Sequence, residues 1–248
     1  MYKAAMTVVY WCIGILIITG LGTAAFTLFF DQSILVRKGA FWRAETTEKV
    51  VALTFDDGPS PEWTGPILDE LKNAGITATF FMLGRQAERF PGLVRRVMEE
   101  GHEIGNHSCS HRNLLFRNRR FLETEIRGAE TNIRSACGVT TKYFRPPKAW
   151  LSGGGKKSIE EMGYRVILWT LSSKDWAFFD ESRIVRRILK NIRPGVILLF
   201  HDGGGVFGPE GGNRSVTVKS IPLLAENLKS DGYRFVTIHE LITLHEHD

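Results

Sequence analysis

The chain has 248 residues, of which 43% are hydrophobic and 24% are charged. This is enough for one sizeable hydrophobic core, and nothing in the sequence requires a second globular domain. The formal net charge of +5 is mild and no nucleic-acid-binding motif accompanies it, so we predict neither a nucleic-acid partner nor an obligate protein partner.

The N-terminal segment contains no charged residue between Ala4 and Phe30. At about 1.5 Å per residue, a helix of this length can span a bilayer core of roughly 30 Å. We therefore predict a transmembrane anchor or signal-anchor over residues 1–31, followed by a polar linker over 32–46. The apolar run is longer than the roughly 7–15 residues of a signal peptide, although small residues near its end leave cleavage and secretion as an alternative.

Strand and helix signals alternate through the rest of the chain. The expected strands cover residues 50–55, 77–83, 103–105, 142–144, 164–171, 196–200 and 234–238. The expected helices cover about 63–74, the stretch that ends at Glu100, 121–136, 155–163, 181–191, 217–230 and the last residues. About seven βα units in one domain predict a parallel sheet with helical cover, either open or closed into a barrel. Polar residues follow five separate strands, which favours a barrel over an open doubly wound sheet.

Two adjacent carboxylates, Asp56 and Asp57, follow the first of these strands. Like charges this close repel each other, and one of the two pKa values rises as a result. A metal ion bound to one carboxylate removes that difficulty and leaves the other free as a base. From this stretch alone, a helix cap or a solvated turn explains the pair equally well.

Two histidines, His107 and His111, lie four residues apart after the strand at 103–105. If the strand turns into a helix here, both imidazoles project from one face and can bind one metal ion. The same spacing also occurs by chance on surface helices. Together with Asp57, the two histidines would form a one-carboxylate, two-histidine site with room for water, which is the open coordination of a catalytic metal.

Five motifs, in this order and at strand ends, resemble those of the polysaccharide deacetylases of the NodB-homology type, carbohydrate esterase family 4. They are Thr54–Ser60, His107–His111, Arg145–Pro147, Asp175–Trp176 and Leu199–His201. The resemblance covers about residues 47–243, and we predict a catalytic domain over 47–248. It implies a distorted (β/α)7 barrel, in agreement with the number of βα units.

The resemblance also implies roles for individual residues. The metal ligands would be Asp57, His107 and His111. The catalytic residues would be Asp56 as general base, Arg145 as the group that orients it, His201 as general acid and Asp175 as the residue that tunes that histidine. The substrate groove would include Pro147, Lys148, Trp150 and Trp176. The expected metal is Zn²⁺, with Co²⁺, Mn²⁺ or Ni²⁺ as alternatives.

The chain departs from the family pattern at three places. Lys148 stands where an aromatic residue often follows the third motif, so the groove floor becomes basic and Trp150 takes the place of the missing ring. Ser172 stands where the fourth motif often begins with an acidic residue, which we interpret as the loss of a secondary contact. An additional segment between Gly205 and Asn213 is expected to shape the rim of the cleft.

The activity implied by the resemblance is the metal-dependent removal of N-acetyl groups from an extracytoplasmic aminosugar polymer, either peptidoglycan or a chitin-like oligosaccharide. We expect a single-pass membrane protein with the catalytic domain outside the cytoplasm. One alternative is an O-deacetylase of a polysaccharide such as xylan, which the motifs do not separate from an N-deacetylase. Another is a non-catalytic wall-binding protein, which the completeness of the motif set disfavours.

Overall fold

The computed structural model describes residues 2–26, 37–178, 180–204 and 212–247. The predicted linker over 32–46 therefore lies partly outside the described residues. Of the additional segment between Gly205 and Asn213, only residues 212 and 213 are described.

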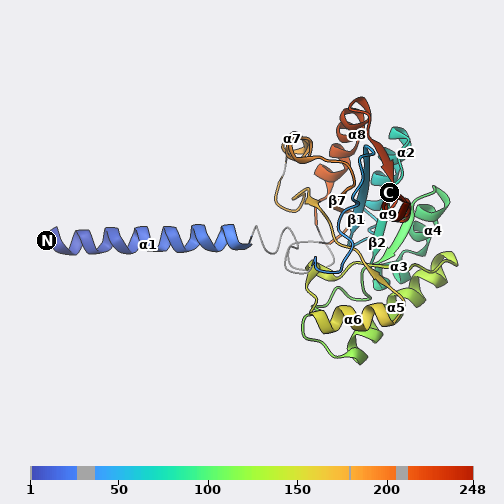
Figure 1. Ribbon diagram of the computed structural model, residues 1–248, viewed down its shortest axis with the longest axis horizontal. Helices are drawn as coiled ribbons and strands as arrows, with labels where there is room; N and C mark the ends of the chain where they lie inside the picture. Colours follow the sequence, from blue (N-terminus) through green and yellow to red (C-terminus); the bar gives the residue numbers. More distant parts are fainter. Residues whose placement is uncertain (1, 27–36, 179, 205–211, 248) are drawn as a thin grey trace.

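The N-terminal helix α1 covers Tyr2–Phe26 and is drawn apart from the other elements in Figure 1. The transmembrane helix predicted over residues 1–31 is not supported. Among the described residues, no helix combines the length and the apolar composition needed to cross a membrane.

The rest of the described chain forms an eight-stranded parallel sheet surrounded by helices (Figure 1). The strands are β1 (Val50–Asp56), β2 (Thr79–Met82), β3 (Glu103–Asn106), β4 (Tyr143–Phe144), β5 (Arg165–Val166), β6 (Leu171–Ser172), β7 (Val196–His201) and β8 (Arg234–Val236). They follow the order β5-β4-β3-β2-β1-β7-β6, and β8 pairs with the first half of β1. This parallel half-barrel fits the predicted NodB-like (β/α)7 fold.

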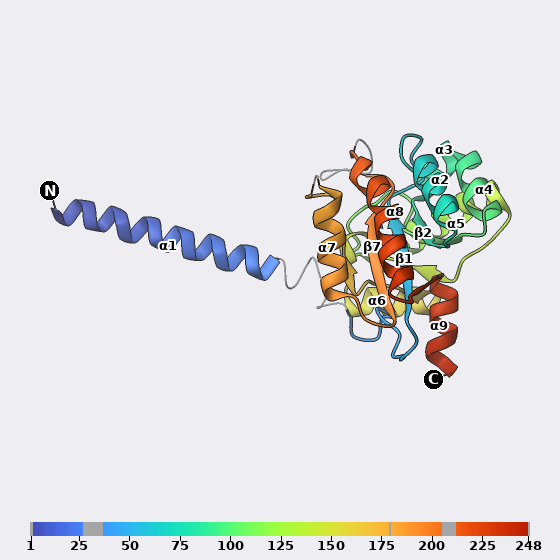
Figure 2. The same ribbon diagram turned by 90° about the horizontal axis from the view of Figure 1, so that it is seen from above.

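Helices connect the strands and cover the sheet. They are α2 (Thr64–Ala74), α3 (Gly84–Arg89), α4 (Pro91–Glu99), α5 (Arg119–Cys137), α6 (Gly153–Glu161), α7 (Glu181–Asn191), α8 (Ser215–Ser230) and α9 (Ile238–His247), with a short 3-10 helix η3 (Pro147–Ala149). Figure 2 shows β1 and β7 enclosed between these helices, with α7 and α8 side by side.

Two predicted elements are divided in the structure. The helix expected to end at Glu100 is two helices, because Pro91 cannot donate an N–H to the preceding turn and instead begins α4. The strand expected over 164–171 is interrupted between β5 and β6. There the Phe41 N–H donates to Val166 O and the Leu168 N–H donates to Phe41 O, both at 2.8–2.9 Å, so the residues near Phe41 provide the pairing that a neighbouring strand would otherwise supply.

Strand β1 is the structural centre of the sheet, and all seven of its residues are buried. Its side chains alternate between two core clusters, as expected for a strand covered on both faces. Val51, Leu53 and Phe55 pack into one cluster, and Val50 and Ala52 pack into another. The two carboxylates that follow therefore stand at the end of a strand that is held on both sides.

Candidate active site

The carboxyl ends of β1 and β7 lie side by side. The two strands are parallel, and their register pairs Asp56 with His201. On the other side of β1, β2 connects to β3, whose last residue Asn106 pairs with Phe144 of β4. The residues that follow these strands therefore meet at one end of the sheet, as the barrel interpretation predicts.

Arg145 holds Asp56 from within the core. Its Nη1 donates hydrogen bonds to Asp56 Oδ1 at 2.7 Å and to Thr54 Oγ1 at 2.8 Å, and its Nη2 donates to Leu168 O at 3.3 Å. The guanidinium is completely buried and lies 4.0 Å from the centre of the Phe81 ring. Burial lowers the pKa of Arg145, but the charge of Asp56 opposes that effect. The removal of one member of such a buried pair typically costs about 3–5 kcal/mol, so Asp56 is firmly held.

Three potential metal ligands converge beside this pair. His107 Nε2 lies 3.4 Å from Asp57 Oδ1, and His111 Nε2 lies 3.1 Å from the same oxygen. The ligand atoms of all three residues lie within 4.8 Å of one another. Donors around a tetrahedral metal with bonds of about 2.0–2.1 Å are separated by about 3.4 Å, so the three residues fit a single divalent ion.

The two histidines are not on a helix, so the condition under which the sequence placed both imidazoles on one helix face is not met. Ser108 and His111 have φ angles of 70° and 55°, values that a helix does not allow. Hydrogen bonds within the loop support this path: the Ser108 N–H donates to Asn106 Oδ1 at 2.9 Å, and the His111 N–H donates to Ser108 Oγ at 3.2 Å. A looped segment, held by its own side chains, brings the imidazoles together.

The environment of each candidate ligand suits a metal. His107 Nδ1 lies 2.8 Å from Arg145 O, and because a carbonyl only accepts, Nδ1 carries the proton and Nε2 keeps its lone pair for a metal. Asp57 Oδ1 is buried and has no hydrogen-bond partner among the described residues. Burial disfavours the ionised form of Asp57, yet the charges of His111 and His107 hold its pKa well below the usual range. Burial lowers the pKa of His111, which favours the neutral ring that coordinates metals.

The loop after β7 keeps Asp57 in position. Asp57 has a φ of 77°, an uncommon value for a residue other than glycine. A Cβ added to Gly203 would lie 2.6 Å from Asp57 O, and one added to Gly204 would lie 2.3 Å from Asp57 Oδ2. Only glycines allow the two segments to approach so closely. The side chain of Arg214 fixes this pair by donating to the carbonyls of Gly203 and Gly204 at 2.9 and 2.8 Å.

Asp202, a buried residue outside the predicted site, ties the same loop to α2. Its Oδ1 accepts the Gly58 N–H at 3.0 Å, and its Oδ2 accepts the Thr64 hydroxyl at 2.6 Å. Its own N–H donates to Asp56 O at 3.1 Å. Burial raises the pKa of Asp202 to about 7, with a further contribution from the charge of Asp57. Asp202 therefore positions the backbone on both sides of the two carboxylates.

His201, which is partly buried, forms a second pair with the buried Asp175. His201 Nδ1 lies 2.8 Å from Asp175 Oδ1, and Asp175 Oδ2 accepts hydrogen bonds from the His201 N–H and from Thr217 Oγ1, both at 2.8 Å. Burial lowers the pKa of His201, but the carboxylate of Asp175 outweighs that effect and raises it. Burial opposes ionisation of Asp175, but His201 outweighs it and lowers the pKa of Asp175 to about 2. The charged form of the imidazole is thus favoured, with Nε2 directed away from Asp175.

Comparison with known proteins identifies the family. Residues 43–167 match the family model described as polysaccharide deacetylase. A peptidoglycan-N-acetylglucosamine deacetylase of Bacillus cereus is 37% identical over 203 residues, which cover 81% of this chain and 92% of that protein. This chain belongs to the polysaccharide deacetylase family. The resemblance drawn from the five motifs is confirmed, and the protein is an enzyme of this hydrolase family.

Two further relatives extend the comparison. A chitooligosaccharide deacetylase of Rhizobium leguminosarum bv. trifolii is 38% identical over 164 residues, covering 66% of this chain and 76% of that protein. The crystal structure of a peptidoglycan N-acetylglucosamine deacetylase in complex with 4-naphthalen-1-yl-N-oxidanyl-benzamide is 31% identical, with a TM-score of 0.77, and the match covers 88% of this chain and 95% of that one. The half-barrel of this deacetylase is therefore shared with proteins of known structure.

The four predicted groove residues of the deacetylase follow Arg145 or Asp175 closely in the sequence, and they differ in solvent exposure. Pro147 is buried, whereas Lys148 is exposed and has a left-handed backbone with a φ of 56°. Lys148 Nζ lies 5.3 Å from the centre of the Trp150 ring, and its charge contributes to the lowered pKa of His111. Trp176 directly follows Asp175 and is 36% exposed. Lys148 thus brings a positive charge to the side of the metal ligands.

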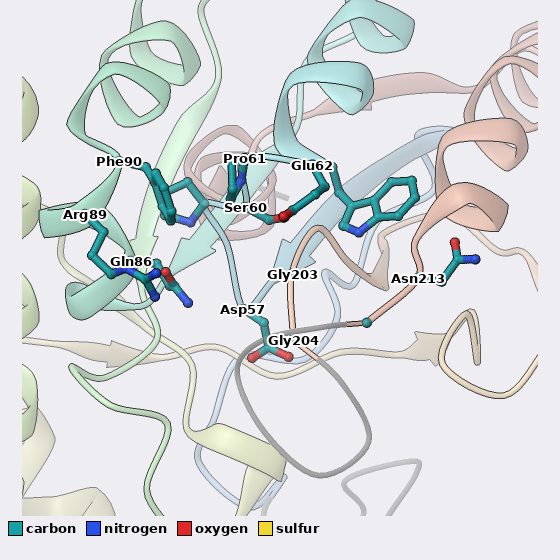
Figure 3. A pocket seen from close by; sticks show the side chains of 13 residues that line it. Asp57, Ser60, Pro61, Glu62, Gln86, Arg89, Phe90, Gly203, Gly204 and Asn213 are labelled. Atoms are coloured by element: carbon teal, nitrogen blue, oxygen red, sulfur yellow. The ribbon is translucent and has the colours of Figure 1, made fainter.

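A cavity of about 580 Å³ extends from Asp57 towards α3. Its lining residues are Asp57, Pro59, Ser60, Pro61, Glu62, Trp63, Gln86, Arg89, Phe90, Gly203, Gly204, Gly212 and Asn213. Figure 3 shows Gln86 and Arg89 at the left of this space, Ser60 and Glu62 above it, and Asp57 below, beside Gly204. Of the predicted site residues, only Asp57 lines the cavity. Pro59 and Ser60 belong to the first motif and Gly212 to the segment expected at the rim, whereas the sequence carried no signal for the remaining lining residues. The deacetylase thus has room for a bulky substrate group next to its candidate metal site.

Proposed function

We propose that this deacetylase removes N-acetyl groups from an extracytoplasmic aminosugar polymer, with peptidoglycan as the preferred substrate. The observation that carries the proposal is the convergence of three sets of groups at one end of the sheet. These are the Asp56–Arg145 pair, the Asp57, His107 and His111 cluster and the His201–Asp175 pair. The names of its relatives, peptidoglycan-N-acetylglucosamine deacetylase and chitooligosaccharide deacetylase, support an N-acetylated substrate.

In this proposal, Asp57, His107 and His111 hold one divalent metal ion, for which the donor set favours Zn²⁺. When bound, such an ion supplies a Lewis acid that polarises the acetyl carbonyl and lowers the pKa of water. The orphaned Asp57 Oδ1 and the fixed tautomer of His107 are the features of the chain that support it.

Asp56 acts as the general base. Arg145 donates to one oxygen of its carboxylate and fixes its orientation. The other oxygen is available to take a proton from the attacking water as the hydroxyl oxygen bonds to the acetyl carbon. A base positioned in this way typically contributes about 10²–10⁴-fold.

His201 acts as the general acid. Asp175 holds its Nδ1–H, so Nε2 presents a proton to the sugar nitrogen. The proton moves to that nitrogen as the carbon–nitrogen bond breaks, which releases acetate and the free amine. We assign the Lys148 main-chain N–H, in its left-handed conformation, as a hydrogen-bond donor to the negative oxygen of the tetrahedral intermediate.

The test is acetate release by the full chain. The protein is stripped with a chelator and assayed on peptidoglycan, on N-acetylglucosamine oligomers and on acetylated xylan, with and without added Zn²⁺. Zn²⁺-dependent release from peptidoglycan, absent in Asp57→Ala, is expected. Release from xylan alone would instead support O-deacetylation, and an absence of release from all three substrates, despite bound metal, would refute the proposal. Detection of the protein in extracytoplasmic fractions would support the proposed location.

A further inference from the structure

A second concentration of charge lies at the amino-terminal end of β7. A pocket of about 400 Å³ surrounds Val196, the first residue of this strand. Four arginines line it: Arg37, Arg43, Arg187 and Arg193. His201 ends the same strand, five residues later, so at about 3.3 Å per residue the pocket lies roughly 16 Å from the active site along β7. It is a separate site.

The four arginines have no carboxylate beside them. No aspartate or glutamate lines the pocket, and within the described parts of the chain none of the four guanidinium groups forms an ion pair. The adjacent Arg186 on α7 differs, because its Nη2 lies 3.9 Å from Asp180 Oδ2. Like charges that gather without a counter-charge repel one another, so an anion in the pocket would relieve an unfavourable field.

Three of the four arginines are held by hydrogen bonds, yet most of their donors are not used by the described residues. Arg37 Nη2 donates to Trp169 O and Thr170 O at 3.3 and 3.4 Å. Arg43 Nε and Arg187 Nε each donate one hydrogen bond at 3.3 Å, to the carbonyls of Ala44 and Ser172 respectively. Since a guanidinium has five N–H donors, these contacts orient the groups and leave most of their donors for a ligand.

Arg37 gives the clearest indication that a partner is missing. Its guanidinium stacks on the Trp42 ring at 4.2 Å, which fixes its plane. Its Nε is buried and has no hydrogen-bond partner among the described residues. Buried donors in proteins are nearly always paired with protein, water or ligand. An acceptor in this pocket would supply the missing partner.

We propose that the pocket binds the phosphate group of a small organic phosphate. Planar guanidinium groups match the oxygens of phosphate through pairs of parallel hydrogen bonds. A phosphate group offers more acceptor oxygens than a carboxylate and up to two charges, so it can engage more arginines at once. The volume of about 400 Å³ exceeds the size of a phosphate ion, which leaves room for an organic substituent such as a glycerol unit.

The test is calorimetric titration of the full chain at constant ionic strength. Three probes are used: inorganic phosphate, glycerol 1-phosphate and vesicles that contain phosphatidylglycerol. We expect one saturable site per chain. Arg187→Gln should weaken binding by about 10-fold or more, since a hydrogen bond to a charged group is lost. The matched control Arg186→Gln, one residue away, should bind within about twofold of the wild type, and both variants should deacetylate at the wild-type rate.

The outcomes separate the sources of phosphate and the ways in which the proposal can fail. Binding of glycerol 1-phosphate points to a soluble ligand, whereas binding of the vesicles alone points to a lipid headgroup. If Arg187→Gln unfolds, Arg43→Gln serves in its place. The proposal is refuted if no probe binds saturably, or if acetate binds as tightly as inorganic phosphate. It is also refuted if the folded arginine variant binds as tightly as the wild type, because this would place the phosphate elsewhere, for example at the metal site.

Discussion

The two ends of β7 differ in how their charges are arranged. At the carboxyl end, His201 is hydrogen-bonded to Asp175, and the neighbouring Asp56 accepts a hydrogen bond from Arg145. At the amino end, the arginines around Val196 have no carboxylate partner among the described residues. Both regions adjoin one strand, β7, of which every residue except His201 is buried.

The difference shows what each end requires from outside the chain. At the carboxyl end, the chain itself orients the paired charges, and a metal ion and the substrate would complete the proposed reaction. At the amino end, a bound anion would supply the counter-charge that the described residues do not provide. Changes at the first end should therefore affect chemistry, and changes at the second should affect binding or surface charge while the chemistry continues.

The largest effect is expected for Asp57→Ala. The change removes the carboxylate that both His107 and His111 approach, so the chain should lose metal binding and its hydrolysis should fall to background. Metal content by mass spectrometry and acetate release measure the two effects. The exposed Asp69→Ala is the control and should keep both. Full activity in metal-free Asp57→Ala would contradict the assignment.

Asp56→Asn should separate the base from the metal site. The amide keeps an oxygen that accepts the Arg145 hydrogen bond, but it cannot take a proton from water. We expect kcat to fall by about 10²–10⁴-fold while metal binding remains stoichiometric. Loss of metal together with activity would show that Asp56 is a ligand and not a base.

Asp175→Asn should shift the pH profile. The negative charge of Asp175 raises the pKa of His201, so its removal lowers that pKa and reduces the protonated fraction at neutral pH. Because the proposed acid must be protonated, the alkaline limb of the kcat profile should move to lower pH, and kcat at neutral pH should fall by roughly 10–100-fold. As the control, Thr217→Val removes a hydrogen bond to Asp175 but keeps the charge of that carboxylate. The alkaline limb of its kcat profile should stay at the wild-type pH.

Asp202→Ala should act mainly on stability. The Gly58 N–H and the Thr64 hydroxyl lose their buried acceptor, which typically costs about 1–3 kcal/mol in the free energy of unfolding. Since the folded-state pKa is raised to about 7, folding favours the protonated carboxyl. The contribution of Asp202 to the free energy of unfolding is therefore largest in acid and is lost as the pH rises through about 7. Urea unfolding at several pH values should show this dependence in the wild type and not in Asp202→Asn.

Arg193→Gln should have the smallest effect. This exposed arginine is one of four cations in the pocket at the amino end of β7, and without phosphate it loses no ion pair with a described residue. We expect the free energy of unfolding to change by no more than about 0.5 kcal/mol in phosphate-free buffer, with kcat unchanged. A larger destabilisation would show that Arg193 already has a structural partner and would weaken the contrast between the two ends.

The sequence indicated which residues meet at the carboxyl end, because they lie in short segments at the ends of strands. Asp56 and Asp57 directly follow a buried strand, and His201 ends another, so a parallel sheet was enough to place them together. The sequence left the path between His107 and His111 open, and the helix considered for it is not formed. Left-handed angles at Ser108 and His111 depend on hydrogen bonds that the local sequence does not reveal.

Contacts between distant segments were beyond the reach of the sequence. The break between β5 and β6 depends on Phe41, more than 120 residues earlier in the chain. The clamp on Asp57 depends on Arg214, and the arginine pocket joins residues from 37 to 196. Each of these contacts joins segments that are far apart in the sequence, so no local pattern around the residue reveals it.

Arg145 serves the two halves of the active site through different parts of one residue. Its side chain holds Asp56, whereas its main-chain oxygen holds His107. A substitution at this position alters the first contact and keeps the second, since every amino acid has the same carbonyl. An Arg145 variant that still folds would thus be an inert, metal-competent form of the enzyme, suited to capturing an uncleaved acetylated polymer for structural work.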